Sequence, residues 1–128
     1  MRALVATERG GFAVDLETEE IEPADVAIAE DVPAVDLPRL VAAAVAGSTV
    51  VAVVDARPPM LVSHDAGITW RESGRGLPAG YAVAIDETNP DTVVYASRNR
   101  LHLSTDGGRF WHTLATELPR IRHLQMEA

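Results

Sequence analysis

The side chains of this sequence best suited to hold a ligand are arginines, because all eleven of its basic residues are Arg. A guanidinium fork pairs with carboxylate and phosphate groups through parallel hydrogen bonds. Eight of the arginines lie in or beside the connections between predicted strands: Arg9, Arg39, Arg57, Arg75, Arg98, Arg100, Arg120 and Arg122. They predict either an anion-binding site or plain surface ion pairs with acids of the same loops, namely Glu8, Asp36, Asp55 and Glu117.

The composition of the chain excludes several classes of protein and of binding partner. The 128 residues suit one domain, and 47% hydrophobic with 23% charged residues is a globular composition. A formal charge of -8 argues against nucleic acid as a partner, and no apolar run is long enough to span a membrane. The absence of cysteine excludes disulfides and thiolate metal sites. We expect a soluble, cytoplasmic protein.

Two markers recur along the chain with a period of about 40 residues, which is typical of stacked structural units. The run Ser63 to Trp70 (SHDAGITW) returns at Ser104 to Trp111 (STDGGRFW), with Ser, Asp, Gly and Trp each displaced by 41 positions. The dipeptide Leu-Pro occurs at residues 37–38, 77–78 and 118–119. Both markers indicate the same repeat.

Alternating and β-branched runs predict four short strands in each repeat. Each Leu-Pro precedes a first strand, at residues 40–46, 81–86 and 122–127. Second strands are predicted at 50–54 and 92–96, and third strands at 60–63 and 101–104. A fourth strand is expected to run through each Trp, and residues 86–91, with their Asn-Pro, form a turn.

The S-x-D-x-G-x-T-W pattern, with the run NPDTVVYA before the second copy, resembles the Asp-box, or bacterial neuraminidase repeat, family of β-propellers. That family includes sialidases, xyloglucan-cleaving glycosidases, sortilin-type receptors and photosystem II assembly factors. The resemblance covers residues 37–128 and implies an all-β propeller of four-stranded blades. It also implies that loops before the first strand and after the second strand of a blade share one rim, which would gather the arginines there.

The repeated motifs themselves are expected to build turns. A short polar side chain can satisfy backbone N–H groups in a tight turn, and glycine accepts a positive φ without strain. The Trp that follows is expected to pack against the adjoining blade. These structural residues are Ser63, Asp65, Gly67, Trp70, Ser104, Asp106, Gly108 and Trp111.

The first unit departs from this pattern, because no first strand precedes it and no motif follows it. Residues 1–36 read as a degenerate blade with strands at 2–7, 11–16 and 26–29, and the stretch from residue 17 to residue 36 is strongly acidic. Units at 37–76 and 77–117 are complete, and residues 118–128 supply a spare first strand. Three blades cannot close a ring. We therefore expect a homodimer with six blades, in which the last strand completes the first unit of the partner; a higher oligomer or a different partner chain is the alternative.

A catalytic set is not evident. A sialidase-like reaction would need an Arg cluster, a Tyr nucleophile beside a Glu, and a separate acid, and only Tyr81 and Tyr95 could be nucleophiles. The four histidines, His64, His102, His112 and His123, show no metal-ligand spacing, so we expect no metal or cofactor. The leading hypothesis is a non-enzymatic binding or scaffold propeller that engages a protein partner or a small anionic ligand at the loop rim and central channel. Its candidate residues are Arg39, Arg120, Arg122, His123, Tyr81, Arg98 and Arg100; the alternative is a glycoside hydrolase or lyase with its active site on the dimer axis.

Overall fold

A computed structural model describes residues 1–27, 33 and 35–127, and it is built from β-strands. The twelve strands are β1 (Arg2–Thr7), β2 (Gly10–Asp15), β3 (Ile21–Pro23), β4 (Leu40–Ala46), β5 (Thr49–Val54), β6 (Met60–Ser63), β7 (Arg71–Ser73), β8 (Gly80–Asp86), β9 (Asn89–Ser97), β10 (Leu101–Ser104), β11 (His112–Thr113) and β12 (Ile121–Met126). They form three antiparallel sheets of four strands. Sheet I has the order β12-β1-β2-β3, sheet II is β4-β5-β6-β7, and sheet III is β8-β9-β10-β11.

No helix that could cross a membrane occurs among the residues described.

The central strand of each sheet is formed by a run of β-branched and small apolar residues. All six residues of β5, with the sequence TVVAVV, are buried, and so are Thr92 to Ser97 in β9. Branched side chains pack well on a pleated sheet, and burial of both faces removes the need for polar alternation. The second and third sheets therefore form where the repeat predicts them.

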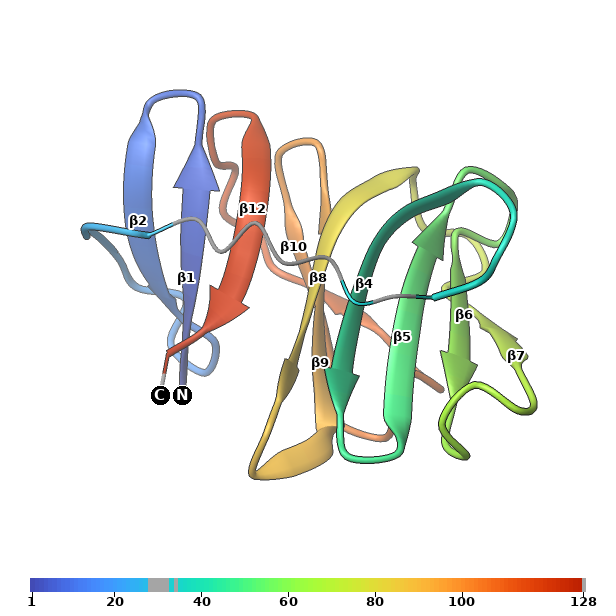
Figure 1. Ribbon diagram of the computed structural model, residues 1–128. Helices are drawn as coiled ribbons and strands as arrows, with labels where there is room; N and C mark the ends of the chain where they lie inside the picture. The colour runs from blue at the N-terminus through green and yellow to red at the C-terminus, as the bar shows by residue number, and fades with distance from the viewer. Residues whose placement is uncertain (28–32, 34, 128) are drawn as a thin grey trace.

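The three sheets stand in a row, with sheet III between the other two (Figure 1). One core cluster joins sheets II and III and includes Val51, Met60, Ile85 and Tyr95. A second cluster joins sheets III and I and includes Val5, Ala84, Leu101 and Leu124. The first strands β4, β8 and β12 are neighbours along this row, so β8 contributes side chains to both cores.

From the strand count we expected the last strand to complete the sheet of a partner chain. The structure differs from this expectation. Strand β12 pairs with β1 of its own chain, with Val5 opposite Leu124 and Leu4 opposite Gln125. Sheets I and II lie at opposite ends of the row, so residues 24–39 must connect them. This connection is much longer than the one from Ser73 to Gly80, and its length lets β1–β3 reach the far end of the row.

Three smaller expectations also differ from the structure. The fourth strands of sheets II and III, which we expected to run through Trp70 and Trp111, begin only after them, at Arg71 and His112. The fourth strand of the first unit is β3, at Ile21–Pro23, where we expected residues 26–29. Of those, residues 26 and 27 form no strand, and residues 28 and 29 lie outside the described residues. The turn expected over residues 86–91 is shorter, because Asn89-Pro90-Asp91 already belongs to β9.

Closure within one chain can be tested with a disulfide, because the chain has no cysteine of its own. Leu4 and Gln125 are direct neighbours across the β1–β12 ladder, at about the 4.5–5.5 Å Cα separation of opposite residues, which a disulfide can span. We expect the oxidised Leu4→Cys/Gln125→Cys double variant to run as a single chain on a denaturing, non-reducing gel. A two-chain band would show strand exchange, and each single-cysteine variant is the control.

Candidate functional site

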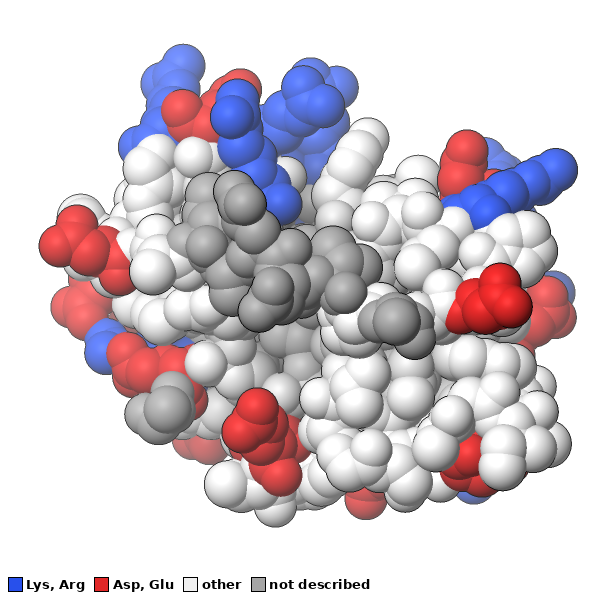
Figure 2. Space-filling model, in the orientation of Figure 1, with Lys and Arg blue, Asp and Glu red and all other residues white. Residues whose placement is uncertain are grey.

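The connections that carry most of the arginines lie at one end of the sheets. The turns β1–β2, β5–β6 and β9–β10 and the entries into β4, β8 and β12 are all at the upper end in Figure 1. Most Arg side chains visible in Figure 2 lie along this upper edge, with a few acidic side chains among them. We call this edge the arginine rim.

Backbone hydrogen bonds hold three of the rim loops together. Ile121 N–H donates to Arg98 O at 2.8 Å, and Leu118 N–H donates to Asn99 O at 2.8 Å. Glu8 N–H donates to Arg120 O at 2.9 Å. These bonds bring the loops of Arg98, Arg100 and Arg120 beside the β1–β2 turn, above sheets III and I.

The remaining predicted residues are spread along the row. Arg39 is exposed in the entry to β4, in sheet II, where its carbonyl accepts a hydrogen bond from Asp55 N–H at 2.9 Å. Tyr81 is 42% exposed near the start of β8, and Arg122 is exposed near the start of β12. The structure therefore does not gather the seven predicted residues into one pocket.

The ion pairs that would make the rim arginines a plain solubilising surface are not formed among the described residues. None of Glu8, Asp36, Asp55 and Glu117 makes a salt bridge in this part of the chain; the pairs present are Arg2–Glu22, Arg2–Glu127 and Arg75–Glu72. The Arg75–Glu72 pair is long, at 3.9 Å, and both side chains are well exposed. Such a pair does little to hold Arg75 in place. Arg100 donates a hydrogen bond to Ala115 O at 3.2 Å.

One depression in the rim contains two of these arginines. A groove of about 440 Å³ is lined by Arg57, Arg75, Leu77 and the three prolines Pro58, Pro59 and Pro78, with Gly76. It lies between the β5–β6 loop and the connection from β7 to β8. Arg57 and Arg75 were among the arginines assigned to the rim from sequence, but only the loop geometry shows that they share a groove with an apolar wall.

The groove is supported from below by Tyr95. Its hydroxyl donates to Pro78 O at 2.6 Å, and burial raises the pKa of this phenol, which keeps it protonated as a donor. A side chain at Gly80 would meet the Tyr95 ring at 2.0 Å. Only glycine at residue 80 therefore lets the chain pass over the ring and continue from the groove into β8.

His102 packs against Tyr95, with ring centroids 5.5 Å apart. Its two ring nitrogens contact Ser97 Oγ at 2.9 Å and Thr113 Oγ1 at 2.8 Å. Burial lowers the pKa of His102 to about 4, so the ring is neutral at pH 7. The histidine is thus a hydrogen-bonded part of the support and no metal ligand; no cluster of possible ligands occurs elsewhere among the residues described.

A second, larger groove runs along the first strands of the three sheets. It has a volume of about 740 Å³ and an apolar floor that includes Val45, Val83 and Leu124. Its polar residues are mostly acidic or neutral: Asp86, Glu87, Thr88, Gln125, Glu127 and His123, and none of the described lining residues is an arginine. His123 Nε2 is buried without a hydrogen-bond partner among the described residues. This groove is the place where a central channel was expected, but its charge does not suit an anion.

The two repeated motifs form closely similar turns. Ser63 Oγ accepts from Gly67 N–H at 2.8 Å, and Asp65 accepts from Thr69 N–H at 2.8 Å. In the second motif, Ser104 Oγ accepts from Gly108 N–H at 2.9 Å and Asp106 from Phe110 N–H at 3.0 Å. Hydrogen bonds from the Thr69 side chain and backbone, with Ser63, lower the pKa of Asp65 to about 2. Each carboxylate accepts hydrogen bonds from backbone and side-chain donors of its own turn, as expected for a residue that builds the turn.

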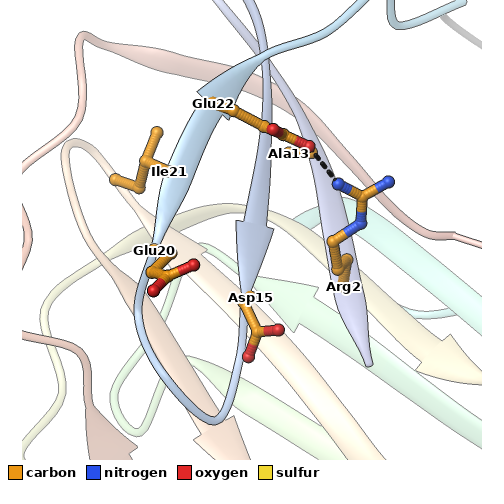
Figure 3. Close-up of a pocket in the computed structure, with 6 residues that line it drawn as sticks. All are labelled: Arg2, Ala13, Asp15, Glu20, Ile21 and Glu22. Atoms are coloured by element: carbon orange, nitrogen blue, oxygen red, sulfur yellow. Dashed lines mark hydrogen bonds and ion pairs between the residues drawn. The ribbon is translucent and has the colours of Figure 1, made fainter.

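Sequence reasoning gave no role to Arg2, which organises the outer face of sheet I. Its Nε and Nη2 donate to the two oxygens of Glu127 at 2.9 and 2.6 Å, and its Nη1 pairs with Glu22. These contacts raise the pKa of Arg2 and lower that of Glu127. Figure 3 shows Arg2 pointing to Glu22 beside a shallow pocket of about 230 Å³, whose other lining residues include Asp15 and Glu20. Only the β1–β12 pairing puts residues 2 and 127 together.

Comparisons with known proteins relate the chain to a fold. No known protein family matches its sequence, and no curated protein matches it. Among solved structures it is similar to a GH74 enzyme from Niastella koreensis, with a TM-score of 0.50 and 20% sequence identity. The likeness covers 92% of this chain and 18% of the enzyme, so the chain spans under one fifth of the length of that neighbour. GH74 enzymes are β-propeller glycoside hydrolases, and the three sheets of this chain thus have a propeller-type arrangement.

The low pKa of His102 predicts that the free energy of unfolding decreases at acidic pH. The unfolded chain takes up a proton near pH 6.5, while the folded His102 does so only near pH 4. Stability is therefore complete above pH 6.5 and falls as the pH drops toward 4, by about 1–3 kcal/mol. Urea unfolding at several pH values between 7.5 and 4.5 measures this slope. His102→Gln should flatten it, and an equal slope in that variant would contradict the assignment.

Proposed function

We propose that this chain is a non-enzymatic binding module whose arginine rim holds an anionic group of a protein partner or of a small molecule. The observation that carries the proposal is the groove in which Arg57 and Arg75 flank an apolar wall of Leu77 and prolines. Two guanidinium groups give a fork for a carboxylate or phosphate, and the wall suits an apolar portion attached to it. The loops of Arg98, Arg100 and Arg120 extend the same positive edge.

The formal charge of -8 makes this binding a local effect. An anion approaching the molecule at random is repelled, so affinity must come from short-range hydrogen bonds to the guanidinium groups. The acidic side chains in Figure 2 lie mainly away from the upper edge, which separates the two charges on the surface. A partner whose anionic group is attached to an apolar segment would bind more tightly than free phosphate, because the segment can pack against Leu77 and the prolines.

The proposal includes the architecture that carries the rim. Each sheet is a blade, sheets II and III are Asp-box blades, and two chains make a six-bladed ring. Support comes from the two motif turns, in which the Ser and Asp side chains make the same kinds of hydrogen bond, and from the likeness to a GH74 enzyme. A two-fold ring would present each set of rim arginines twice around one axis.

A glycoside hydrolase is the second candidate, favoured by the fold of that neighbour and by the carboxylates of the 740 Å³ groove, Asp86, Glu87 and Glu127. Paired carboxylates are what most glycosidases require. Turnover of a panel of chromogenic glycosides, sialosides included, tests it. Activity that Glu127→Gln abolishes would favour the enzyme over the binding module.

The binding function is tested with phenyl phosphate and benzoate as probes, each an anion on an apolar ring. We expect NMR titration to shift signals of Leu77 and Arg75, with both probes competing. Arg57→Ser/Arg75→Ser should weaken binding by about tenfold or more, because charge-assisted hydrogen bonds are lost. Arg109→Ser, a change in a motif turn on the opposite rim, is the matched control. Equal binding by both variants would contradict the proposed site.

A further inference from the structure

The contact between sheets III and II is made by the second motif turn. Arg71 Nη2 donates to Gly107 O at 3.0 Å, and Ser73 Oγ donates to Gly108 O. Trp111 Nε1 donates to Ser73 Oγ at 3.1 Å, and its ring packs edge-on to Tyr95 at 6.1 Å. The turn thus docks its two carbonyls and its Trp on β7 of the neighbouring sheet.

The first motif turn offers the same docking group on the outer face of sheet II. Ala66 and Gly67 correspond to Gly107 and Gly108, and both turns share left-handed backbone at these positions. Trp70 corresponds to Trp111. No strand of the described chain packs against this turn or this face. Val41 of β4 is 44% exposed, and Ile68, two residues before Trp70, is 81% exposed.

Each chain also has one sheet face on which such a turn of a second copy could dock, the outer face of sheet I. In the row, sheet II presents its outer face at one end and sheet I presents its outer face at the other. On sheet I the side chains that point away from the core shared with sheet III include Arg2, Leu4, Ala13 and Glu22. Ala24 and Val26 lie against this face at Gly11, and Ala13 is buried, so the open part of the face is the part that carries Arg2 and Glu22. Each chain therefore has one such turn and one such open region that no other sheet covers among the described residues.

We infer that the first motif turn of one chain, with Trp70 and Val41, docks on the outer face of sheet I of a second copy. The inference rests on the six-bladed ring proposed above and identifies its interface. A two-fold axis makes the contact twice, because each chain supplies one turn and one receiving face. It continues the internal contact of sheets II and III, so the same kind of junction would recur around the whole ring.

Arg2 supplies the donor that this junction needs. At the internal junction, Arg71 donates to the carbonyl of the turn. On sheet I the residue facing outward from β3 is Glu22, an acceptor, and it is held by Arg2. Arg2 uses its Nε, one N–H of Nη1 and one of Nη2 for Glu127 and Glu22, which leaves two of the five N–H groups of a guanidinium for a partner's Ala66 or Gly67 carbonyl.

The test is the absolute mass of the whole chain in solution, by light scattering over a concentration series. We expect twice 13.7 kDa for the unmodified chain. Val41→Asp and Trp70→Ala should each raise the dissociation constant by about 30-fold or more, as truncation of an interface anchor does. Phe110→Ser, a change of a 79% exposed residue in the second turn, should leave the mass unchanged. Far-ultraviolet circular dichroism shows that each variant is folded.

A second measurement does not depend on disrupting the interface. The chain has two tryptophans, so Trp111→Phe leaves Trp70 as the single reporter. Its emission should shift to the red on dilution, over the concentrations at which the mass falls. A folded monomer at all concentrations, or a dimer that survives both interface variants, overturns this inference. Neither outcome touches Arg57 or Arg75, so anion binding at the rim stands or falls separately.

Discussion

The structure depends on the pairing of β12 with β1. This ladder joins the last strand of the chain to the first, in a register that sets Val5 opposite Leu124. It turns three N-terminal strands and one C-terminal strand into a complete sheet and places that sheet against sheet III. Because the pairing fixes sheet I at the far end of the row from sheet II, residues 24–39 must span from one end to the other, and each end of the row keeps a face without a packed sheet in the described part of the chain.

The direction of the strands also determines where positive and negative side chains lie on the surface. Every first strand enters at the upper edge, so the loops before it and the loops between second and third strands meet there and bring the arginines with them. The turns between first and second strands lie at the opposite end, where Asp86 and Glu87 edge the large groove. A positive rim and an acidic groove are therefore consequences of strand direction.

Buried side-chain contacts support the loop that forms one wall of the rim groove. Tyr95 connects the loop at Pro78 to the core. His102 packs against Tyr95 and is itself held by hydrogen bonds to Ser97 and Thr113. Gly80 makes the close passage over Tyr95 possible. Nothing in the repeat marks these residues, because the position of sheet II that corresponds to Tyr95 in the strand ladder is Ala52. The support belongs to sheet III, beneath the groove that Arg57 and Arg75 line.

The sequence by itself determined the strands of sheets II and III, the position of the motif turns and the placement of most arginines in connections, because these features follow from local periodicity and turn chemistry. It also indicated a first unit that lacks its own first strand. The tertiary structure decided which chain supplies that strand, since intrachain and interchain pairing satisfy the same pattern of residues. It also decided that Arg57 and Arg75 share a groove while Arg39 stands apart, and that residues 2 and 127 meet, because such contacts arise only when distant segments pack.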